Sequence, residues 1–298
     1  MAKPRRKAES FDSRTTPVRD DLAAAHLRNR VQRPRYAEGE TRQVAVPVLP
    51  LGFRPGADAR LESQLLFGEG FTVYDEAEGW AWGQSALDGY VGYVPADGLA
   101  AELTRPSHAV AATTSHLYPD ADLKQRPLAQ LSLASRVEVV EERAGYCRLA
   151  GGGWLFAKHL APLDEPAPDY IGTGLRLLGV PYLWGGRSAQ GVDCSGFLQL
   201  VLQRAGIACP RDTDQQAEAL GDAVPEPYEP AALKHGDLVF FPGHVGIVLD
   251  GGRFLHANAF DMAVAVHPLD EVLARADAAG AGVSGARRLW AEAGPAPQ

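Results

Sequence analysis

The fold is decided by the stretch Tyr182-Leu183-Trp184-Gly185-Gly186, followed by Asp193-Cys194-Ser195-Gly196-Phe197. After it, apolar residues recur at helical spacing until Gly206 supplies a stop, which predicts a helix that begins beside Cys194. Unsatisfied N–H groups at the start of a helix stabilise an anion, so we expect the pKa of the Cys194 thiol to be lowered. Cys194 is therefore the candidate nucleophile, and a buried structural cysteine is the alternative.

Two histidines downstream are candidate partners for this thiol. Residues 240–258 predict two strands joined by a three-residue turn. In such a hairpin His244 and His256 share one face, because their numbers differ by an even amount. We expect that face to look toward Cys194, with His244 as the base and His256 holding its tautomer. Asn258 is an alternative for the orienting role.

These motifs resemble the NlpC/P60 family of papain-like cysteine peptidases, which cut bacterial cell-wall peptides. The matching residues are 193–197 around the cysteine, 243–247 around the first histidine, and His256. The resemblance covers residues 166 to 270 and implies a papain-like domain. A group of helices followed by an antiparallel sheet is also what the residue pattern predicts, so the fold class is α+β.

Further residues near the cysteine are candidates for binding the substrate. The N–H of Cys194 is the natural oxyanion donor, and the resemblance implies the Tyr182 hydroxyl as a second. Asp193 opposes formation of a neighbouring thiolate, so it needs another purpose, of which helix capping is one. The resemblance implies instead that Asp193 and Ser195 grip a peptide ammonium. Two further positions match the family's groove: Trp184 and Thr213.

Short β-like runs separated by glycine turns occur twice before the peptidase segment. Both copies resemble the bacterial SH3-like domains that accompany NlpC-type catalytic domains, so we expect two small SH3-like β-barrels. In family members with this organisation, the first SH3-like domain walls off the substrate groove with a glutamate and a tyrosine. The resemblance places these two residues at Glu69 and Tyr90.

The chain of 298 residues thus divides into four predicted parts. They are a polar tail with one short helix (1–40), a first SH3-like barrel (41–104), a linker at 105–127 with a second SH3-like barrel (within 105–165), and the peptidase domain (166–298).

Composition limits the functional classes. A net charge of -8 argues against binding to nucleic-acid backbones, and the basic run at residues 3–7 is a short tail. No apolar stretch has the length of a secretory signal or a membrane span, so we expect a cytoplasmic protein with no membrane partner. Cys147, Cys194 and Cys209 form neither a disulfide framework nor a metal-ligand spacing, which fits a reducing compartment.

The resemblance implies a γ-D-glutamyl-L-diamino-acid endopeptidase that needs no metal or organic cofactor. Its substrates would be murein tripeptides or tetrapeptides with a free N-terminal L-Ala, from which it removes L-Ala-γ-D-Glu. Placement in the cytoplasm makes it a recycling enzyme. The alternatives are a murein hydrolase that acts on intact, glycan-linked stems, and a non-catalytic module that binds wall peptide.

Overall fold

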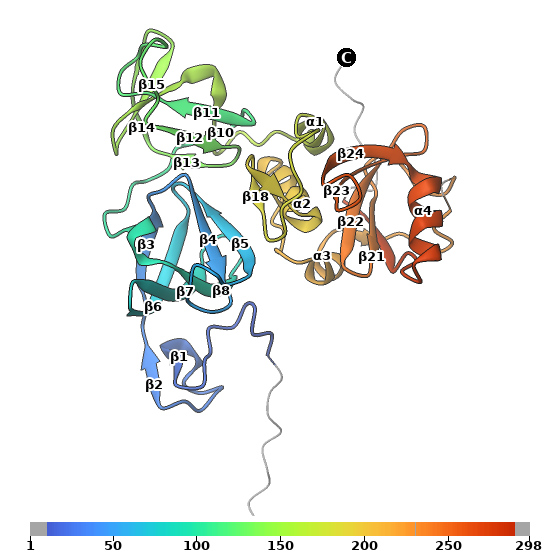
Figure 1. Cartoon of the computed structure of the whole chain (residues 1–298), viewed down its shortest axis with the longest axis horizontal. Helices are drawn as coiled ribbons and strands as arrows, with labels where there is room; N and C mark the ends of the chain where they lie inside the picture. Colours follow the sequence, from blue (N-terminus) through green and yellow to red (C-terminus); the bar gives the residue numbers. More distant parts are fainter. Residues whose placement is uncertain (1–10, 230, 290–298) are drawn as a thin grey trace, which may run out of the picture.

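The computed structural model describes residues 11–229 and 231–289, so the basic run at residues 3–7 lies outside the described residues. Two β-rich units precede an α+β unit, and the first of them lies beside the helix that begins at Cys194 (Figure 1). Within the described ranges, no helix combines the length and the apolar character needed to cross a membrane.

The short helix predicted within residues 1–40 is absent from the described part of that segment, residues 11–40. The segment instead forms two parallel strands and a 3-10 turn: β1 (Leu22–Ala24), η1 (Ala25–Leu27) and β2 (Arg35–Ala37). Leu22 is buried against Trp82 and Val91 of the following unit. Leu22 therefore anchors the segment to its neighbour, and this tertiary contact outweighs helix propensity.

The first β unit is a seven-stranded antiparallel sheet with the order β5-β4-β8-β7-β6-β3-β9. Its strands are β3 (Glu40–Val44), β4 (Val48–Gly52), β5 (Leu61–Leu66), β6 (Gly70–Ala77), β7 (Trp80–Ser85), β8 (Val91–Pro95) and β9 (Leu99–Ala100). The sheet surrounds a core that includes Leu51, Phe71 and Val94. The predicted β unit is confirmed, but among the described strands β5 and β9 do not pair to close a barrel.

The second β unit consists of three small antiparallel sheets around Val110, Leu131 and Leu155. Its strands are β10 (His108–Val110), β11 (Thr114–Leu117), β12 (Ala129–Ser132), β13 (Arg136–Val137), β14 (Val139–Arg143), β15 (Tyr146–Leu149), β16 (Trp154–Phe156) and β17 (Leu160–Pro162). The linker predicted at 105–127 contains β10 and β11. Because β10 pairs with both β13 and β17, it belongs to the framework of the unit.

The third unit is an antiparallel sheet with the order β20-β25-β21-β22-β23-β24. Its strands are β20 (Asp222–Ala223), β21 (Leu238–Phe241), β22 (His244–Leu249), β23 (Arg253–Asn258), β24 (Ala263–Pro268) and β25 (Gly285–Arg288). Helices α1 (Tyr170–Leu175), α2 (Cys194–Arg204), α3 (Thr213–Ala219) and α4 (Leu269–Ala278) accompany it, with a small hairpin of β18 (Arg187–Ser188) and β19 (Gly191–Val192).

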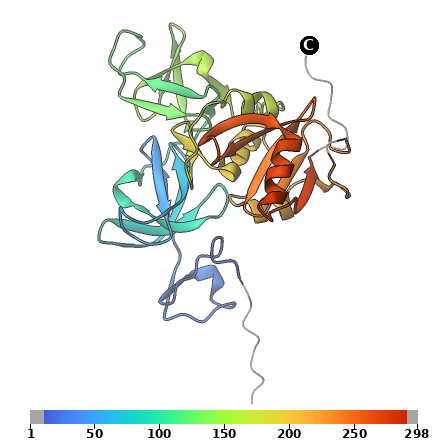
Figure 2. The same ribbon diagram turned by 45° about the vertical axis from the view of Figure 1, so that its right-hand side comes forward.

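Helices cover this sheet on both faces. Val245 and Ile247 of β22 share an apolar cluster with residues of α1 and α2, whereas Val248 packs with α4. Figure 2 shows α4 in front of the sheet, with α2 on the other side. The prediction of an α+β unit is thus confirmed.

Helix α2 starts at Cys194, as predicted. The Asp193 carboxylate caps it by accepting a hydrogen bond of 2.7 Å from the Gly196 N–H. A Cβ atom at Gly196 would lie 2.1 Å from the carbonyl oxygen of Gly186, so only glycine allows the helix to approach this loop. Gly206, at φ +75°, follows the last turn.

A buried ion pair joins the first β unit to the third. Arg187 donates hydrogen bonds of 2.8 and 3.1 Å to the two carboxylate oxygens of Glu69, and each side chain is only 1% exposed. The same guanidinium bonds the carbonyl oxygen of Gln64, whose side-chain oxygen accepts the Arg187 N–H. This contact fixes β5 beside the hairpin that precedes α2.

We predict that Glu69→Gln lowers the free energy of unfolding by about 3–5 kcal/mol, because it leaves the buried Arg187 charge uncompensated. The double variant Glu69→Leu/Arg187→Met removes both charges and should be less destabilised than Glu69→Gln. Urea denaturation followed by tryptophan fluorescence measures both. If Glu69→Gln lowered the free energy of unfolding by less than about 1 kcal/mol, the assignment of Arg187 and Glu69 as a buried ion pair would be contradicted.

Candidate active site

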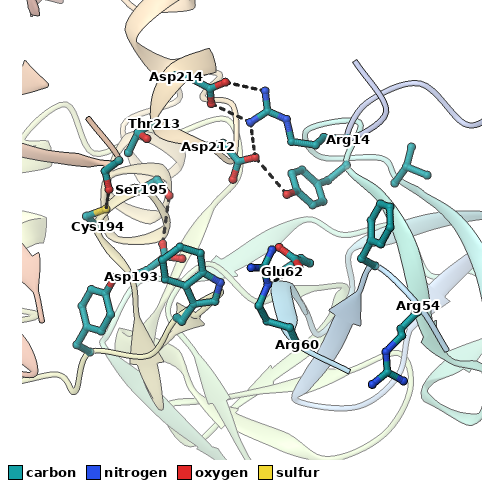
Figure 3. A pocket seen from close by; sticks show the side chains of 16 residues that line it. Arg14, Arg54, Arg60, Glu62, Asp193, Cys194, Ser195, Asp212, Thr213 and Asp214 are labelled. Carbon is teal, nitrogen blue, oxygen red and sulfur yellow. Dashed lines mark hydrogen bonds and ion pairs between the residues drawn. The ribbon is translucent and has the colours of Figure 1, made fainter. Parts of the chain in front are cut away.

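A pocket of 660 Å³ lies where the first β unit meets the start of α2. Cys194 and Trp184 line it from the third unit, Glu62 and Tyr90 from the first β unit, and Arg14 from the N-terminal segment. Figure 3 shows the cysteine on one side of the pocket and the side chains of β5 across from it. Three segments far apart in the sequence therefore build one cavity.

Cys194 is 5% exposed, and its Sγ lies 3.7 Å from the carbonyl oxygen of Gly243. Burial, and then the nearby Asp193 carboxylate, raise the pKa of the Cys194 thiol to about 12. The N–H groups of Val245 and Ser195 act in the opposite direction but have a smaller effect. The expectation of a lowered pKa at the helix start is therefore wrong for this structure, and at neutral pH the thiol needs a base to take its proton.

The two histidines lie together, as predicted. Leu249 pairs with Arg253, which leaves a three-residue loop between β22 and β23. His244 Nε2 and His256 Nδ1 are 2.8 Å apart, a hydrogen-bond distance. Asn258, the alternative orienter, instead accepts a hydrogen bond from the Asp261 N–H.

The face on which the imidazoles lie differs from the expectation. They share strand parity with Phe254, which packs toward α4, whereas the alternating residues, such as Val245, pack toward α2. The thiol thus meets β22 through the backbone beside its first residue, His244, at the end of the sheet. Contact between Cys194 and this strand comes from the strand end rather than from the sheet face.

Gly246 makes room for the histidine pair. A Cβ atom there would lie 2.5 Å from the Phe254 ring and 2.8 Å from the Cβ of His256. Because such contacts are too short for any side chain, only glycine at this position lets β23 hold its histidine close to His244.

A chain of hydrogen bonds continues beyond His256. Its Nε2 lies 3.0 Å from Nδ1 of His267 on β24, and Nε2 of His267 lies 3.1 Å from a carboxylate oxygen of Asp261. Burial lowers the pKa of His244 to about 4 and that of His256 to about 3, so both are neutral at pH 7.

When each of the three imidazoles carries a single proton, one arrangement of donors and acceptors satisfies this chain. The carboxylate of Asp261 only accepts, so His267 carries its proton on Nε2 and accepts at Nδ1 from His256. His256 in turn accepts at Nδ1 from the Nε2–H of His244. In that arrangement Nδ1 of His244 is left as the basic nitrogen.

His267 and Asp261 were not identified from the sequence. Strands β23 and β24 are joined by the four residues 259–262, and Phe254 pairs with His267. Because this loop has an even number of residues, odd-numbered residues of β24 lie on the same face of the sheet as even-numbered residues of β23. His267 therefore lies on the same face as His256. The parity argument used for the first hairpin would have found His267 if it had been extended by one strand.

Asp193 and Ser195 line the pocket, but both are engaged by Arg211. This guanidinium, 1% exposed, donates to the two carboxylate oxygens of Asp193 at 3.0 and 2.7 Å and to the Ser195 hydroxyl at 2.8 Å. The Asp193 charge is thus compensated within the protein. Helix capping, the alternative for Asp193, is present in the structure, and binding of an ammonium by Asp193 and Ser195 stays a prediction.

Glu69 does not line the pocket, because its carboxylate is buried with Arg187. The glutamate that does line it is Glu62 on β5, which makes an ion pair of 2.8 Å with Arg60. The expectation for Glu69 is therefore corrected. The turn after β5 directs Glu69 inward, where it also accepts a hydrogen bond from the Leu66 N–H.

Tyr90 lines the pocket as expected, and its hydroxyl donates a hydrogen bond of 3.1 Å to Asp212. Arg14 donates to Asp212 at 2.9 Å and to Asp214 at 2.7 Å, while its carbonyl accepts from the Val91 N–H. The N-terminal segment, the first β unit and α3 meet here and close one end of the pocket (Figure 3). No local sequence pattern identified Arg14 as a pocket residue, since its partners there, Asp212 and Asp214, lie 198 and 200 residues away.

The remaining expected residues also line this pocket. Burial raises the pKa of Tyr182 to about 12, so its phenol stays protonated and can donate to an oxyanion. Trp184 is 57% exposed and stacks near Arg60, and Thr213 begins α3. Across residues 11–229 and 231–289, no group of three or more His, Cys, Asp or Glu side chains is arranged to hold a metal ion.

Comparison with known proteins identifies two segments. Residues 179–281 match the NlpC/P60 family, and residues 54–99 match the bacterial dipeptidyl-peptidase Sh3 domain. The latter match confirms the SH3-like prediction for the first β unit.

Two relatives are similar over most of the chain. A γ-D-glutamyl-L-lysine dipeptidyl-peptidase from Bacillus subtilis is 29% identical and aligns with 72% of this chain and 78% of its own length. One of the same name from Bacillus cereus is 30% identical and covers 71% of each chain. The crystal structure of an NlpC/P60 family protein from Bacillus cereus has the same fold, with a TM-score of 0.69 and 23% identity over 84% of this chain and 99% of that one. The sequence motifs, the cysteine at the start of α2 with its histidine chain, and these relatives show that the chain belongs to the NlpC/P60 family and is a cysteine peptidase with a papain-like catalytic domain.

Proposed function

We propose that this peptidase removes L-Ala-γ-D-Glu from free murein peptides by cutting the amide bond between γ-D-glutamate and the diamino acid. The observation that carries the proposal is the closed end of the pocket, where Arg14, Tyr90 and Asp212 meet. A substrate chain that starts at this end cannot extend past it. The relatives named γ-D-glutamyl-L-lysine dipeptidyl-peptidases support the same reaction.

The closed end offers carboxylates for a substrate ammonium. Burial raises the pKa of the Tyr90 hydroxyl, and the nearby carboxylates of Asp212 and Glu62 add to this effect. Tyr90 therefore lies within electrostatic reach of both carboxylates. Burial also raises the pKa of Asp212, so a cation bound there would stabilise its charged form. The ammonium of the N-terminal alanine therefore binds between Asp212 and Glu62, with the Tyr90 oxygen as a further ligand. Asp193 and Ser195, which line the same pocket, are further candidate ligands of this ammonium, and Asp193 also caps the start of α2.

The chemistry then follows from the residues around the thiol. Nδ1 of His244 accepts the Cys194 proton as Sγ attacks the γ-carbonyl carbon of glutamate. The backbone N–H at the start of α2 and the Tyr182 hydroxyl stabilise the oxyanion. His244 returns the proton to the leaving amine of the diamino acid, and water then hydrolyses the thioester. His256 stabilises the charged His244 by accepting from its Nε2–H.

We also propose that the enzyme acts in the cytoplasm as a recycling peptidase, and that the second β unit is a second SH3-like module. The three unpaired cysteines, Cys147, Cys194 and Cys209, support a reducing compartment. A hydrolase of intact stems is disfavoured, because their alanine is acylated by the glycan and the pocket end offers charged carboxylates and a wall.

The first test compares L-Ala-γ-D-Glu-L-diamino-acid tripeptides with their N-acetylated forms. We expect mass spectrometry to detect L-Ala-γ-D-Glu from the free peptide, with kcat/KM at least about tenfold lower after acetylation, because two partly buried carboxylates, Glu62 and Asp212, lose their cation. Glu62→Gln should weaken this discrimination, whereas the exposed matched control Glu141→Gln, in the second β unit, should not. Equal kcat/KM values for both peptides would favour the intact-stem hydrolase.

The histidine chain predicts a graded loss of activity. Cys194→Ala and His244→Ala should abolish turnover, His256→Ala should reduce kcat strongly, and His267→Ala should reduce it by about tenfold with little change in KM. The reason is that each step removes a group one hydrogen bond further from the thiol. His116→Ala, an exposed histidine of the second β unit, is the control. Wild-type kcat in His267→Ala would exclude a positioning role for the chain.

The pH profile gives an independent test. A base must be unprotonated, and because burial lowers the pKa of His244 to about 4, we expect kcat/KM to stay level from pH 7 to about pH 5.5. An acid limb centred near the ordinary imidazole value of about 6.5 would contradict this. The buried neutral histidines also make the fold less stable as the pH falls below that value, since the unfolded chain then binds more protons. Circular dichroism at each pH serves as the control for folding.

A further inference from the structure

A second cavity, of 260 Å³, borders the histidine pair. His244 and His256 line it, together with Phe241, Phe260 and, from α4, Arg275 and Ala276. It lies next to the main pocket along the chain, because Gly243 lines the main pocket while His244 lines this cavity. The proposed base therefore lines this second cavity and directly follows a residue that lines the main pocket.

Arg275 is the only formally charged side chain that lines this cavity in the described part of the chain. Its guanidinium carbon lies 4.1 Å from the centre of the Phe260 ring. Within residues 11–229 and 231–289, no carboxylate forms an ion pair with it. A guanidinium held by its face against an aromatic ring keeps its N–H edge available for a carboxylate.

The reaction dictates which part of the substrate reaches this side. The acyl part, with its ammonium, occupies the main pocket under the proposed function. The leaving nitrogen must come within hydrogen-bond reach of His244 to receive the proton. The residue that carries this nitrogen therefore lies beside the cavity that His244 lines.

Resting on the proposed function, we propose that this cavity binds the residue that leaves, and that Arg275 is a specificity-determining residue that binds a carboxylate of that residue. Two carboxylates fit the same chemistry. One is the α-carboxylate of a C-terminal diamino acid, and the other is the side-chain carboxylate that diaminopimelate has and lysine lacks. Phe260 and Ala276 provide an apolar surface for the methylene groups that both diamino acids share.

The test measures kcat and KM for four tripeptides, L-Ala-γ-D-Glu-L-Lys and L-Ala-γ-D-Glu-meso-diaminopimelate, each with a free or an amidated α-carboxyl group. Wild type, Arg275→Gln and Arg275→Lys are compared, with Arg253→Gln on the far end of β23 as the matched control. We expect Arg275→Gln to lower kcat/KM about tenfold, mainly through KM, on substrates whose carboxylate it binds. Arg275→Lys should lose less, because it keeps the charge.

The four substrates distinguish the two carboxylates that Arg275 could bind. If Arg275 binds the α-carboxylate, amidation removes the effect of Arg275→Gln for both diamino acids. If it binds the side-chain carboxylate, the effect persists in the amidated diaminopimelate peptide and is absent from both lysine peptides. An Arg275→Gln enzyme that cleaves all four like wild type, or is impaired equally on all four, overturns the inference alone. A wild-type enzyme that cleaves none of the four overturns the proposed function and this inference with it.

Discussion

The buried ion pair between Arg187 and Glu69 is the contact on which the site depends. It joins the turn after β5 to the hairpin that leads into α2, and a second buried guanidinium, that of Arg211, donates to Ser63 on the same strand. One strand of the first β unit is thus held at two points against the segments that carry the nucleophile. Buried ion pairs add little net stability, but their geometry is demanding, so they specify how two surfaces meet. These contacts place Glu62, which directly precedes Ser63 on β5, at the edge of the pocket.

Burial also sets the protonation state of the reacting groups. It raises the pKa of Cys194 and lowers that of His244, so the resting pair consists of a neutral thiol and a neutral imidazole. Proton transfer and attack are then coupled, and the charge that develops on His244 needs a partner. The chain through His256 and His267 to the Asp261 carboxylate supplies that partner. A histidine in the orienting role requires such support, since an imidazole has two tautomers and a carboxylate has none.

Features that depend on residues close together in the sequence could be predicted from it. The helix beginning at Cys194 followed from periodicity and a glycine stop, and the contact between His244 and His256 followed from strand parity. What could not be predicted depends on residues distant in sequence. Asp193 looked like an unpaired carboxylate because its partner, Arg211, is supplied by the segment before α3. Likewise Glu69 and Glu62 differ only in where the fold directs them, which no single-sequence pattern encodes. The helix start suggested a thiolate, but desolvation, which depends on packing, has the larger effect on its pKa.

Under the proposed function, the length of the released product is set by this arrangement rather than by the catalytic residues. Cys194, His244 and His256 can cleave any amide that reaches them, so they set no limit on what precedes the scissile bond. That limit comes from the first β unit and the N-terminal segment, where Tyr90 and Arg14 meet Asp212. Since these elements are held by buried ion pairs and not by the catalytic unit alone, cleavage chemistry and product length are separate properties of the chain. Under the further proposal, the cavity lined by His244 and Arg275 adds a third property, selection of the leaving part of the substrate by its charge.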